Sequence, residues 1–543
     1  MTSVLRWRFA ATCALTVGLL FALIAAQATA QAASYRVEEA SVAQLQADMA
    51  AGRITSEALV RAYLARIQAV DRSGPTLRSI IALNPKALEQ ARALDAERRA
   101  KGPRGPLHGV PVLVKDNIET ADPMPTTAGS LALKDNLSSR DAPIVARLRA
   151  AGAVILGKTN LSEWANIRSS KSVSGWSAVG GLVKNPYVLD RNACGSSSGS
   201  GAAVSASLAA LAIGTETNGS VTCPASINGV VGLKPTVGLL SRTHIVPISH
   251  TQDTAGPMGR SVADVAAMLT VMAGSDPADP ATREADAHKI DYMVGLGAAT
   301  LVGKRLGVLR PAGRKSVAEL ALFDRTLAAL RAAGAVLVEI DPPPPSPALG
   351  EAEQLILDTE LKADMAGYLA TTSDIVKVRT LSDLIAFDRA TPRELALFGQ
   401  ETFEKAEMSK GLDDPDYLKA LALARRLTRE EGIDRMLADN RLDALIAETT
   451  GPAWRSDGVD ADNSQGSASG TPAIAGYPHL TVPMGDVRGL PVGLSFIGPA
   501  WSEARLLGLG AAFERATHAR RAPSFIPSVE DTPEVASLLA PVP

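Results

Sequence analysis

The first part of the chain has the apolar spacing of amphipathic helices. Between residues 56 and 72, apolar side chains recur at intervals of four, four and three, which predicts a helix with one buried face: Leu59, Tyr63, Ile67 and Val70. Ser41 is a favourable cap for a helix that we expect over 42–51. Asn84-Pro85 supplies a cap and a first-turn proline for a further helix over 85–100.

From residue 110 onward, short apolar runs alternate with helical segments. Residues 110–114 and 153–156 have the apolar character of buried strands, and a predicted helix over 142–151 lies between them. After a mostly helical stretch, about 351–441, the strand-like runs return at 442–447, 479–484 and 490–497. This alternation predicts an α/β protein: a single large domain with a mixed, mostly parallel β-sheet, covered by helices on both faces. Residues 351–441 would then be a helical insert in that domain.

The first thirty residues have the layout of a secretory signal peptide. Arg6 and Arg8 precede an uncharged apolar stretch over 9–26, and small residues suited to cleavage follow at Ala30 and Ala32. The alternative is an uncleaved membrane anchor, since the run is close to the length that spans a bilayer. We expect residues 1–30 to be a signal peptide, residues 31–543 to be the mature domain, and the protein to be periplasmic or secreted without stable membrane association after cleavage.

Composition excludes several classes of protein. The 543 residues carry 55 basic and 57 acidic side chains, so electrostatic capture of nucleic acid or anionic lipid is not expected as the main activity. Three cysteines are too few for a disulfide scaffold. Removal of the signal peptide would leave Cys194 and Cys223 and would bring the net charge from -2 to -4.

Two short motifs match well-known patterns in an unsuitable local context. The segment 152–159 fits the phosphate-binding pattern G-x4-G-K-[ST], but a helix precedes it and its Ala-Val-Ile-Leu interval is itself strand-like. The segment 195–199 fits the nucleophile elbow G-x-S-x-G, with Ser197 as nucleophile. An elbow follows a buried strand, whereas residues 185–192 are polar and irregular. None of the later histidines stands in a distinctive setting either: His244, His250, His288, His479 and His518.

A third constellation joins two serine-glycine segments to a lysine. Segment 196–201 opens an apolar stretch that segment 214–220 closes. A helix of about ten residues climbs roughly 15 Å and a returning strand covers a similar length, so the chain can bring Ser220 back near Ser196. Lys115 ends the strand 110–114, where an inward-facing amine would be desolvated and its neutral form favoured.

These segments resemble the amidase signature family. Its glycine-serine pattern, G-G-S-S-G-G-S-G and then G-T-D-x-G-G-S, corresponds here to 194–201 and 214–220, and its lysine motif to 107–117. Residues 157–164 and 229–235 also match, and the likeness extends from about residue 36 to about 520. Within the family, 215–224 and 162–166 look most like the bacterial peptide amidases, which remove the C-terminal amide from peptides.

The resemblance implies a Ser-Ser-Lys triad. Ser220 would be the nucleophile, Lys115 the general base, and Ser196 the bridging serine, which has a cis peptide bond in the family. The backbone N–H groups of Thr217, Asn218, Gly219 and Ser220 would form the oxyanion hole. No cofactor is implied, and no cysteine or histidine spacing forms a metal motif.

The sequence departs from the family pattern at three positions. Glu216 replaces the common aspartate, Ser198 replaces a glycine, and Asn218 stands at a usual glycine position. Asparagine tolerates positive φ, so we expect the oxyanion turn to persist. Cys194 and Cys223 each lie close to a proposed catalytic serine. We favour small buried hydrophobes, with a disulfide as the alternative.

We therefore expect an exported serine hydrolase that cleaves carboxamides with release of ammonia, acting on the C-terminal amide of peptides. The substrate would be a small molecule or short peptide amide, with no nucleic-acid partner; the oligomeric state is left open. A broad aliphatic or aryl amidase is the alternative in the same family, while tRNA-dependent amidotransferase subunits fit poorly with an export signal. An exported solute-binding protein is the alternative from another class, but it would have no use for the Lys-Ser-Ser arrangement.

Overall fold

A computed structural model describes residues 35–311, 313, 315–343, 346–456, 458, 461–464, 466–532, 535–536 and 539. The predicted signal peptide lies outside these residues. In the described part of the chain, no helix is both long and apolar enough to cross a membrane.

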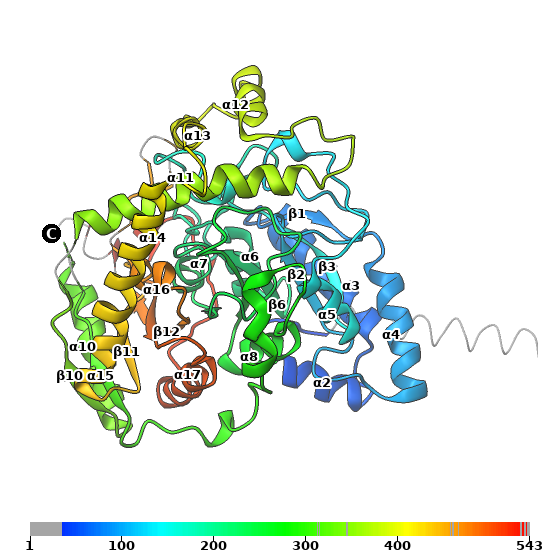
Figure 1. Ribbon diagram of the computed structural model, residues 1–543. Coiled ribbons are helices and arrows are strands. Elements are labelled where there is room, and N and C mark those ends of the chain that lie inside the picture. Colours follow the sequence, from blue (N-terminus) through cyan, green and yellow to red (C-terminus); the bar gives the residue numbers. More distant parts are fainter. Residues whose placement is uncertain are drawn as a thin grey trace, which may run out of the picture.

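A large mixed sheet forms the centre of the molecule (Figure 1). Within the described residues it has 11 strands, which lie side by side in the order β1 (Ile80–Leu83), β3 (Val154–Thr159), β2 (Pro111–Lys115), β6 (Leu211–Glu216), β8 (Thr254–Gly259), β7 (Val231–Lys234), β12 (His479–Val487), β13 (Leu490–Ile497), β11 (Ala444–Glu448), β9 (Arg305–Val308) and β10 (Val336–Glu339). The neighbours β3–β2–β6 and β11–β9–β10 pair in parallel, and the remaining neighbours are antiparallel. A separate two-stranded ribbon joins β4 (Trp176–Ser177) and β5 (Gly181–Leu182).

Helices cover both faces of the sheet. The helices of the first half are α2 (Val42–Ala50), α3 (Ser56–Arg66), α4 (Ala87–Lys101), α5 (Pro143–Ala150), α6 (Ser198–Ser205), α7 (Thr222–Ile227), α8 (Val262–Met272) and α9 (Ala285–His288). Those of the second half are α10 (Val317–Ala332), α11 (Pro347–Leu369), α12 (Leu381–Ala390), α13 (Glu401–Glu407), α14 (Pro415–Thr428), α15 (Asp434–Asn440), α16 (Gly470–Ala475) and α17 (Glu503–Thr517). Helices α6 and α7 pack on one face, and α8 and α17 pack on the other.

These observations confirm the α/β class and the two helical layers. Residues 153–156 lie in or beside β3, so the backbone of the phosphate-loop look-alike is engaged in the sheet, as expected. The expected helix over 56–72 is α3 continued by a π-helical turn, η1 (Ile67–Arg72). Helix α4 begins at Ala87, and Asn84 does not cap it. Instead, Asn84 Oδ1 accepts the Lys86 N–H in a turn that precedes the helix, and Asn84 Nδ2 donates to Asp122.

The helices α11 to α15 form the predicted insert. Its first part lies over the α7 face of the sheet, along the upper side of the molecule in Figure 1. Leu361, Met365 and Phe403 from the insert pack with Trp164 in a buried apolar cluster, which fixes the insert to the segment after β3.

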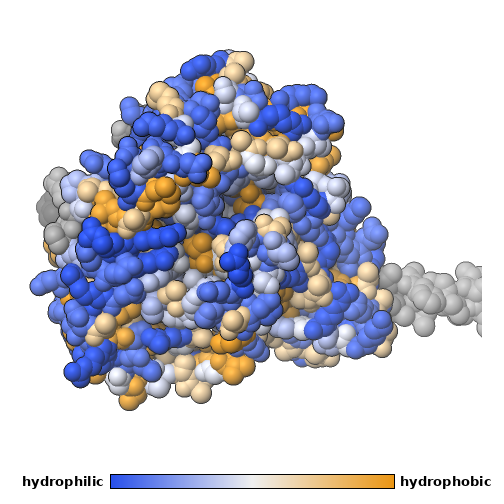
Figure 2. All heavy atoms as spheres, in the orientation of Figure 1, coloured by the Kyte–Doolittle hydropathy of each residue, from blue (hydrophilic) through white to orange (hydrophobic). Residues whose placement is uncertain are grey.

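On the face drawn in Figure 2, hydrophilic side chains predominate and apolar ones form separate patches, as is usual for a water-exposed surface.

Candidate active site

Lys115 lies at the end of β2, with its side chain fully buried. Its Nζ is 2.8 Å from Ser196 Oγ, 2.8 Å from Thr215 Oγ1 and 3.3 Å from the Thr215 carbonyl oxygen. Burial lowers the pKa of Lys115 to about 7, because desolvation outweighs the attraction of Asp253 and Glu216. The lysine can therefore be neutral near pH 7, with two N–H groups for Thr215 and a lone pair directed to Ser196.

Ser196 lies in a tightly packed turn before α6. The Gly195–Ser196 peptide bond is cis, and the Ser196 carbonyl oxygen accepts the Ser162 N–H at 3.0 Å. A Cβ atom on Gly195 would lie 2.1 Å from Ser162 Oγ, so no larger side chain fits there without a shift. Gly199 in α6 is equally constrained, since its Cβ would lie 2.2 Å from the Ser79 carbonyl oxygen. The glycines of the motif thus allow the serine turn to approach neighbouring backbone.

Ser197 has a structural position. Its side chain is fully buried, its Oγ donates to the Thr215 carbonyl oxygen at 3.1 Å, and it accepts the Thr215 N–H at the same distance. This reciprocal pair attaches the turn to the end of β6. No histidine of the described chain hydrogen-bonds to Ser197, and no strand directly precedes the turn. The geometry therefore agrees with our rejection of the nucleophile-elbow interpretation.

Ser220 ends a short loop between β6 and α7. The Ser197 N–H donates to the Ser220 carbonyl oxygen at 3.1 Å, so the out-and-back path of the chain brings the two serine segments together, as predicted. The Ser220 residue is 8% exposed, whereas Ser196 and Ser197 have no exposed surface. Of the three, Ser220 alone can be reached from solvent.

Two carboxylates, Glu216 and Asp253, fix the ends of the loop 217–220. Glu216 accepts the N–H groups of Val221 at 2.7 Å and Thr222 at 2.9 Å, so the glutamate that replaces the usual aspartate has a defined structural task. Asp253 accepts the Thr217 hydroxyl at 2.5 Å. Within the described residues, the backbone N–H groups of 217–220 donate to no protein acceptor. Four unsatisfied donors beside an accessible serine are suited to an oxyanion.

The expectation about Asn218 is wrong in one respect. The positive φ of this turn falls on Gly219, at 82°, and not on Asn218. The asparagine has no need of a left-handed conformation, so its side chain is free to bind neighbours. It donates to Glu353 of α11 at 2.8 Å and accepts from Ser469 Oγ at 2.7 Å, which connects the loop to two distant segments.

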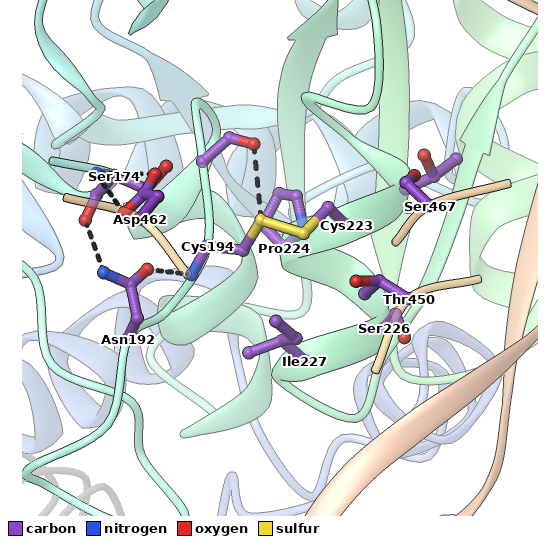
Figure 3. The surroundings of a disulfide bond; sticks show 12 residues. Ser174, Asn192, Cys194, Cys223, Pro224, Ser226, Ile227, Thr450, Asp462 and Ser467 are labelled. Atoms are coloured by element: carbon purple, nitrogen blue, oxygen red, sulfur yellow. Dashed lines mark hydrogen bonds between the residues drawn. A yellow bond between two sulfur atoms is a disulfide. The ribbon is translucent and has the colours of Figure 1, made fainter. Parts of the chain in front are cut away.

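Cys194 and Cys223 form a disulfide, so our preference for two free buried thiols is wrong (Figure 3). The bond connects the residue two positions before Ser196 to the first turn of α7, three positions after Ser220. On one side, Asn192 Oδ1 accepts the Cys194 N–H at 2.6 Å, and Asp462 accepts the Ser174 N–H. The disulfide thus joins the two serine segments covalently.

Sequence reasoning missed the groups that surround the lysine. Thr215 and Asn117 form a chain behind Lys115, with Asn117 Nδ2 3.0 Å from Thr215 Oγ1. Asn117 belongs to the lysine motif and Thr215 to the second serine-glycine segment, so the sequence contained a signal for both. Asp253 lies outside these motifs, and the sequence contained no signal for it. These residues line one wall of a cavity of about 440 Å³, which we call the β2 cavity.

Asn166 is another missed neighbour of the serine turn. It has positive φ, as do Trp164 and Ala165 before it. Its Nδ2 donates to Ser174 Oγ at 3.0 Å and lies 3.2 Å from where a Cβ of Gly195 would be. Its Oδ1 is buried and has no hydrogen-bond partner among the described residues. A strained segment with an unpaired acceptor beside Ser196 has the properties of a substrate-orienting element.

The comparisons with known proteins agree with this fold and site. The family model described as Amidase matches residues 58–507, and the chain belongs to that family. It is therefore an amide-hydrolysing enzyme. A probable amidase of Arabidopsis thaliana is 39% identical over 525 residues, covering 94% of this chain and 96% of the relative.

Solved structures place the chain near one branch of the family. The native peptide amidase of Stenotrophomonas maltophilia is 52% identical, with a TM-score of 0.84, and the match covers 90% of this chain and 99% of that one. The peptide amidase PAM in complex with the competitive inhibitor chymostatin gives 52% identity and a TM-score of 0.85, covering 90% and 100%. A glutamyl-tRNA(Gln) amidotransferase component from Deinococcus radiodurans is more distant, at 35% identity over 87% of this chain and 96% of that protein.

Proposed function

We propose that this enzyme is an exported peptide amidase, which hydrolyses the C-terminal carboxamide of short peptides to a carboxylate and ammonia. The observation that carries the proposal is the contact of fully buried Lys115 with Ser196, beside a loop of free N–H groups that ends at accessible Ser220. Similarity to the Stenotrophomonas peptide amidase supports the choice of peptide amides over other carboxamides. The signal-like residues 1–30 support export.

The proposed reaction begins with proton transfer. Neutral Lys115 takes the proton of Ser196 as Ser196 takes that of Ser220, and the Ser220 oxygen bonds to the carboxamide carbon. The carbonyl oxygen becomes an oxyanion that the N–H groups of 217–220 stabilise; a single donor of this kind contributes about 3 kcal/mol in the transition state. The C–N bond then breaks as the amide nitrogen gains, through Ser196, the proton that Ser220 gave up, and the nitrogen leaves as ammonia. Water hydrolyses the acyl-enzyme by the same proton path.

The pH dependence of this reaction follows from the base. Lys115 acts only when deprotonated, and its pKa lies at about 7. We therefore expect kcat/KM for an N-acetylated amino-acid amide, which does not itself titrate, to rise tenfold per pH unit below about pH 7 and to level off above it. Ammonia release between pH 5 and pH 9 measures this profile. A flat profile across that range would contradict a lysine base.

Labelling identifies the nucleophile. A serine-directed phosphonate followed by mass mapping should place the adduct on Ser220, because Ser220 has exposed surface and Ser197 does not. The matched variants are Ser220→Ala, which should abolish labelling, and Ser197→Ala, which should retain it. An adduct on Ser197 would instead establish the nucleophile-elbow interpretation. Ammonia release from dipeptide amides, compared with simple aliphatic and aryl amides, separates a peptide amidase from a broad amidase.

A further inference from the structure

A second, larger cavity lies on the other side of the proposed oxyanion loop. It has a volume of about 680 Å³ and is bounded by β11, by α15 and by the segment 466–472. We call it the β11 cavity; these elements lie together at the left of Figure 1. Its wall is mainly apolar, with side chains from several elements: Leu309, Leu349, Ile433, Met436, Leu445 and Ile497. This space is large enough for two or three apolar side chains.

The segment that lines one side of the β11 cavity also contacts the proposed oxyanion loop. Ser467 and Gly470 line the cavity, and Ser469 between them donates to Asn218 Oδ1 at 2.7 Å. Ser469 also lies against Gly219, with its Oγ 2.9 Å from where a Cβ of that glycine would be. Thr450 and Ser467, both lining residues, lie near Cys223 and thus near the first turn of α7 (Figure 3). The cavity therefore begins one residue away from the loop that ends at Ser220.

A charged group interrupts the apolar wall. Glu448, at the end of β11, lines the cavity at 8% exposure, and its Oε2 is 2.8 Å from Lys315 Nζ. Lys315 also lies 3.5 Å from Glu319, so two carboxylates face one ammonium. Glu448 Oε1 is buried and has no hydrogen-bond partner among the described residues. The other charged lining residues, Arg310, Glu431 and Arg435, are more exposed. Glu448 therefore offers one unpaired acceptor to a ligand in this cavity.

The proposed reaction requires a large site on the acyl side. Ammonia is the leaving group, so almost the whole substrate lies on the carbonyl side of the bond that breaks. The β2 cavity is smaller; its wall is also mainly apolar, and Arg242, Asp253 and Asp364 are among its charged lining residues. The β11 cavity is larger and mainly apolar, and it contains one acceptor suited to an ammonium group.

We propose, on the basis of the peptide-amidase function, that the β11 cavity binds the apolar residues that precede the last, amidated residue of a short peptide with a free amino terminus. The peptide's α-ammonium is directed to Glu448, whose Oε1 has no hydrogen-bond partner among the described residues. Substrates for this site are di- and tripeptide amides rich in leucine, valine or phenylalanine. N-acetylated peptides lack the ammonium and bind less tightly.

Steady-state ammonia release by the purified full-length protein tests the assignment. The substrates are N-acetylphenylalaninamide, Leu-Phe-amide, Leu-Leu-Phe-amide and N-acetyl-Leu-Leu-Phe-amide. For the wild type, we expect kcat/KM to rise by about tenfold or more from the shortest substrate to Leu-Leu-Phe-amide, since burial of one leucine contributes about 1.5–3 kcal/mol. Ala447→Phe, which fills the cavity from β11, should remove this gain while leaving N-acetylphenylalaninamide within about twofold of wild type.

Matched variants make the result specific. Ala363→Phe fills the β2 cavity and should keep the length dependence. Met436→Trp fills the β11 cavity from α15 and replaces Ala447→Phe if that variant melts early. Glu448→Gln should lower the ratio of kcat/KM for Leu-Leu-Phe-amide over its N-acetylated form by about fivefold to tenfold.

Two outcomes would overturn the proposal: a length dependence that survives both filling variants of the β11 cavity, or one that Ala363→Phe removes. If the ratio of kcat/KM for Leu-Leu-Phe-amide over its N-acetylated form is the same in the wild type and in Glu448→Gln, the role of Glu448 is refuted. If the wild type releases ammonia from none of the four substrates, the proposed function itself is refuted. That outcome differs from those above, in which the enzyme is active and only the assignment of the cavity fails.

Discussion

Replacement of Lys115 by methionine is expected to lower kcat for a peptide amide by about 10³-fold or more, while the protein remains folded. The loss follows because Nζ is the one basic atom in contact with Ser196 among the described residues. The fold should persist because holding a lysine with a pKa of about 7 in the interior costs about 4 kcal/mol at neutral pH, and methionine removes that cost. Ammonia release and thermal melting measure the two effects.

Lys158 provides the matched control, since it is a second fully buried lysine with a lowered pKa of about 8. Its Nζ donates to Thr126 Oγ1 at 2.8 Å and lies 4.0 Å from Asp116, away from the serines. Lys158→Met should lower stability, because Asp116 loses its cation, but it should change kcat only slightly. A large loss of melting temperature in Lys115→Met, or an unchanged kcat, would contradict the role of Lys115 as the base.

Loss of the Cys194–Cys223 disulfide should have the second largest effect. The cysteines are 29 residues apart, and closure of a loop of that length stabilises a fold by about 3–4 kcal/mol in the chain-entropy estimate. The double variant Cys194→Ala/Cys223→Ala should lose about that much free energy of unfolding. It should also lose activity, because the bond fixes the turn of Ser196 to the helix that follows Ser220. Denaturant titration and kcat measure these changes.

Dithiothreitol supplies the control for this experiment. It should lower the kcat and the free energy of unfolding of the wild type toward those of the double variant. The same two quantities should not change when the reductant is added to the double variant. A wild type whose stability and kcat are the same with and without the reductant, after mass spectrometry has established two free thiols, would refute a stabilising role for the bond.

Much of the fold could be predicted from local patterns. The apolar runs at 110–114 and 490–497 correspond to β2 and β13, because a strand buried on both faces needs a continuous apolar segment. Ser41 caps α2 as expected, since a serine cap acts within one helical turn. Asn84 does not cap α4, because its Oδ1 accepts the Lys86 N–H in a turn that precedes the start of the helix at Ala87.

The candidate site could likewise be predicted where the signal was local in the sequence, and could not where distant segments contribute. The proximity of the two serine segments followed from a helix and strand of matched length, and the desolvation of Lys115 followed from its place at the end of an apolar run. The support from Asp253, Glu353 and Ser469 could not be predicted, because it comes from chain segments with no local sequence signal. The disulfide was foreseen only as an alternative, because the proximity of the serine segments brings Cys194 and Cys223 near each other without deciding whether their sulfur atoms bond.

The close backbone approaches at Gly195 and Gly199 determine how this enzyme can be engineered. Side chains at these positions would overlap Ser162 and the Ser79 carbonyl oxygen, so a library that randomises the whole serine-glycine motif would consist mostly of misfolded members. The β11 cavity is bordered instead by side chains with space in front of them, such as Ala447 and Met436. Diversity placed there would alter substrate preference while leaving the catalytic turn intact, which separates the residues to be varied from those to be held fixed.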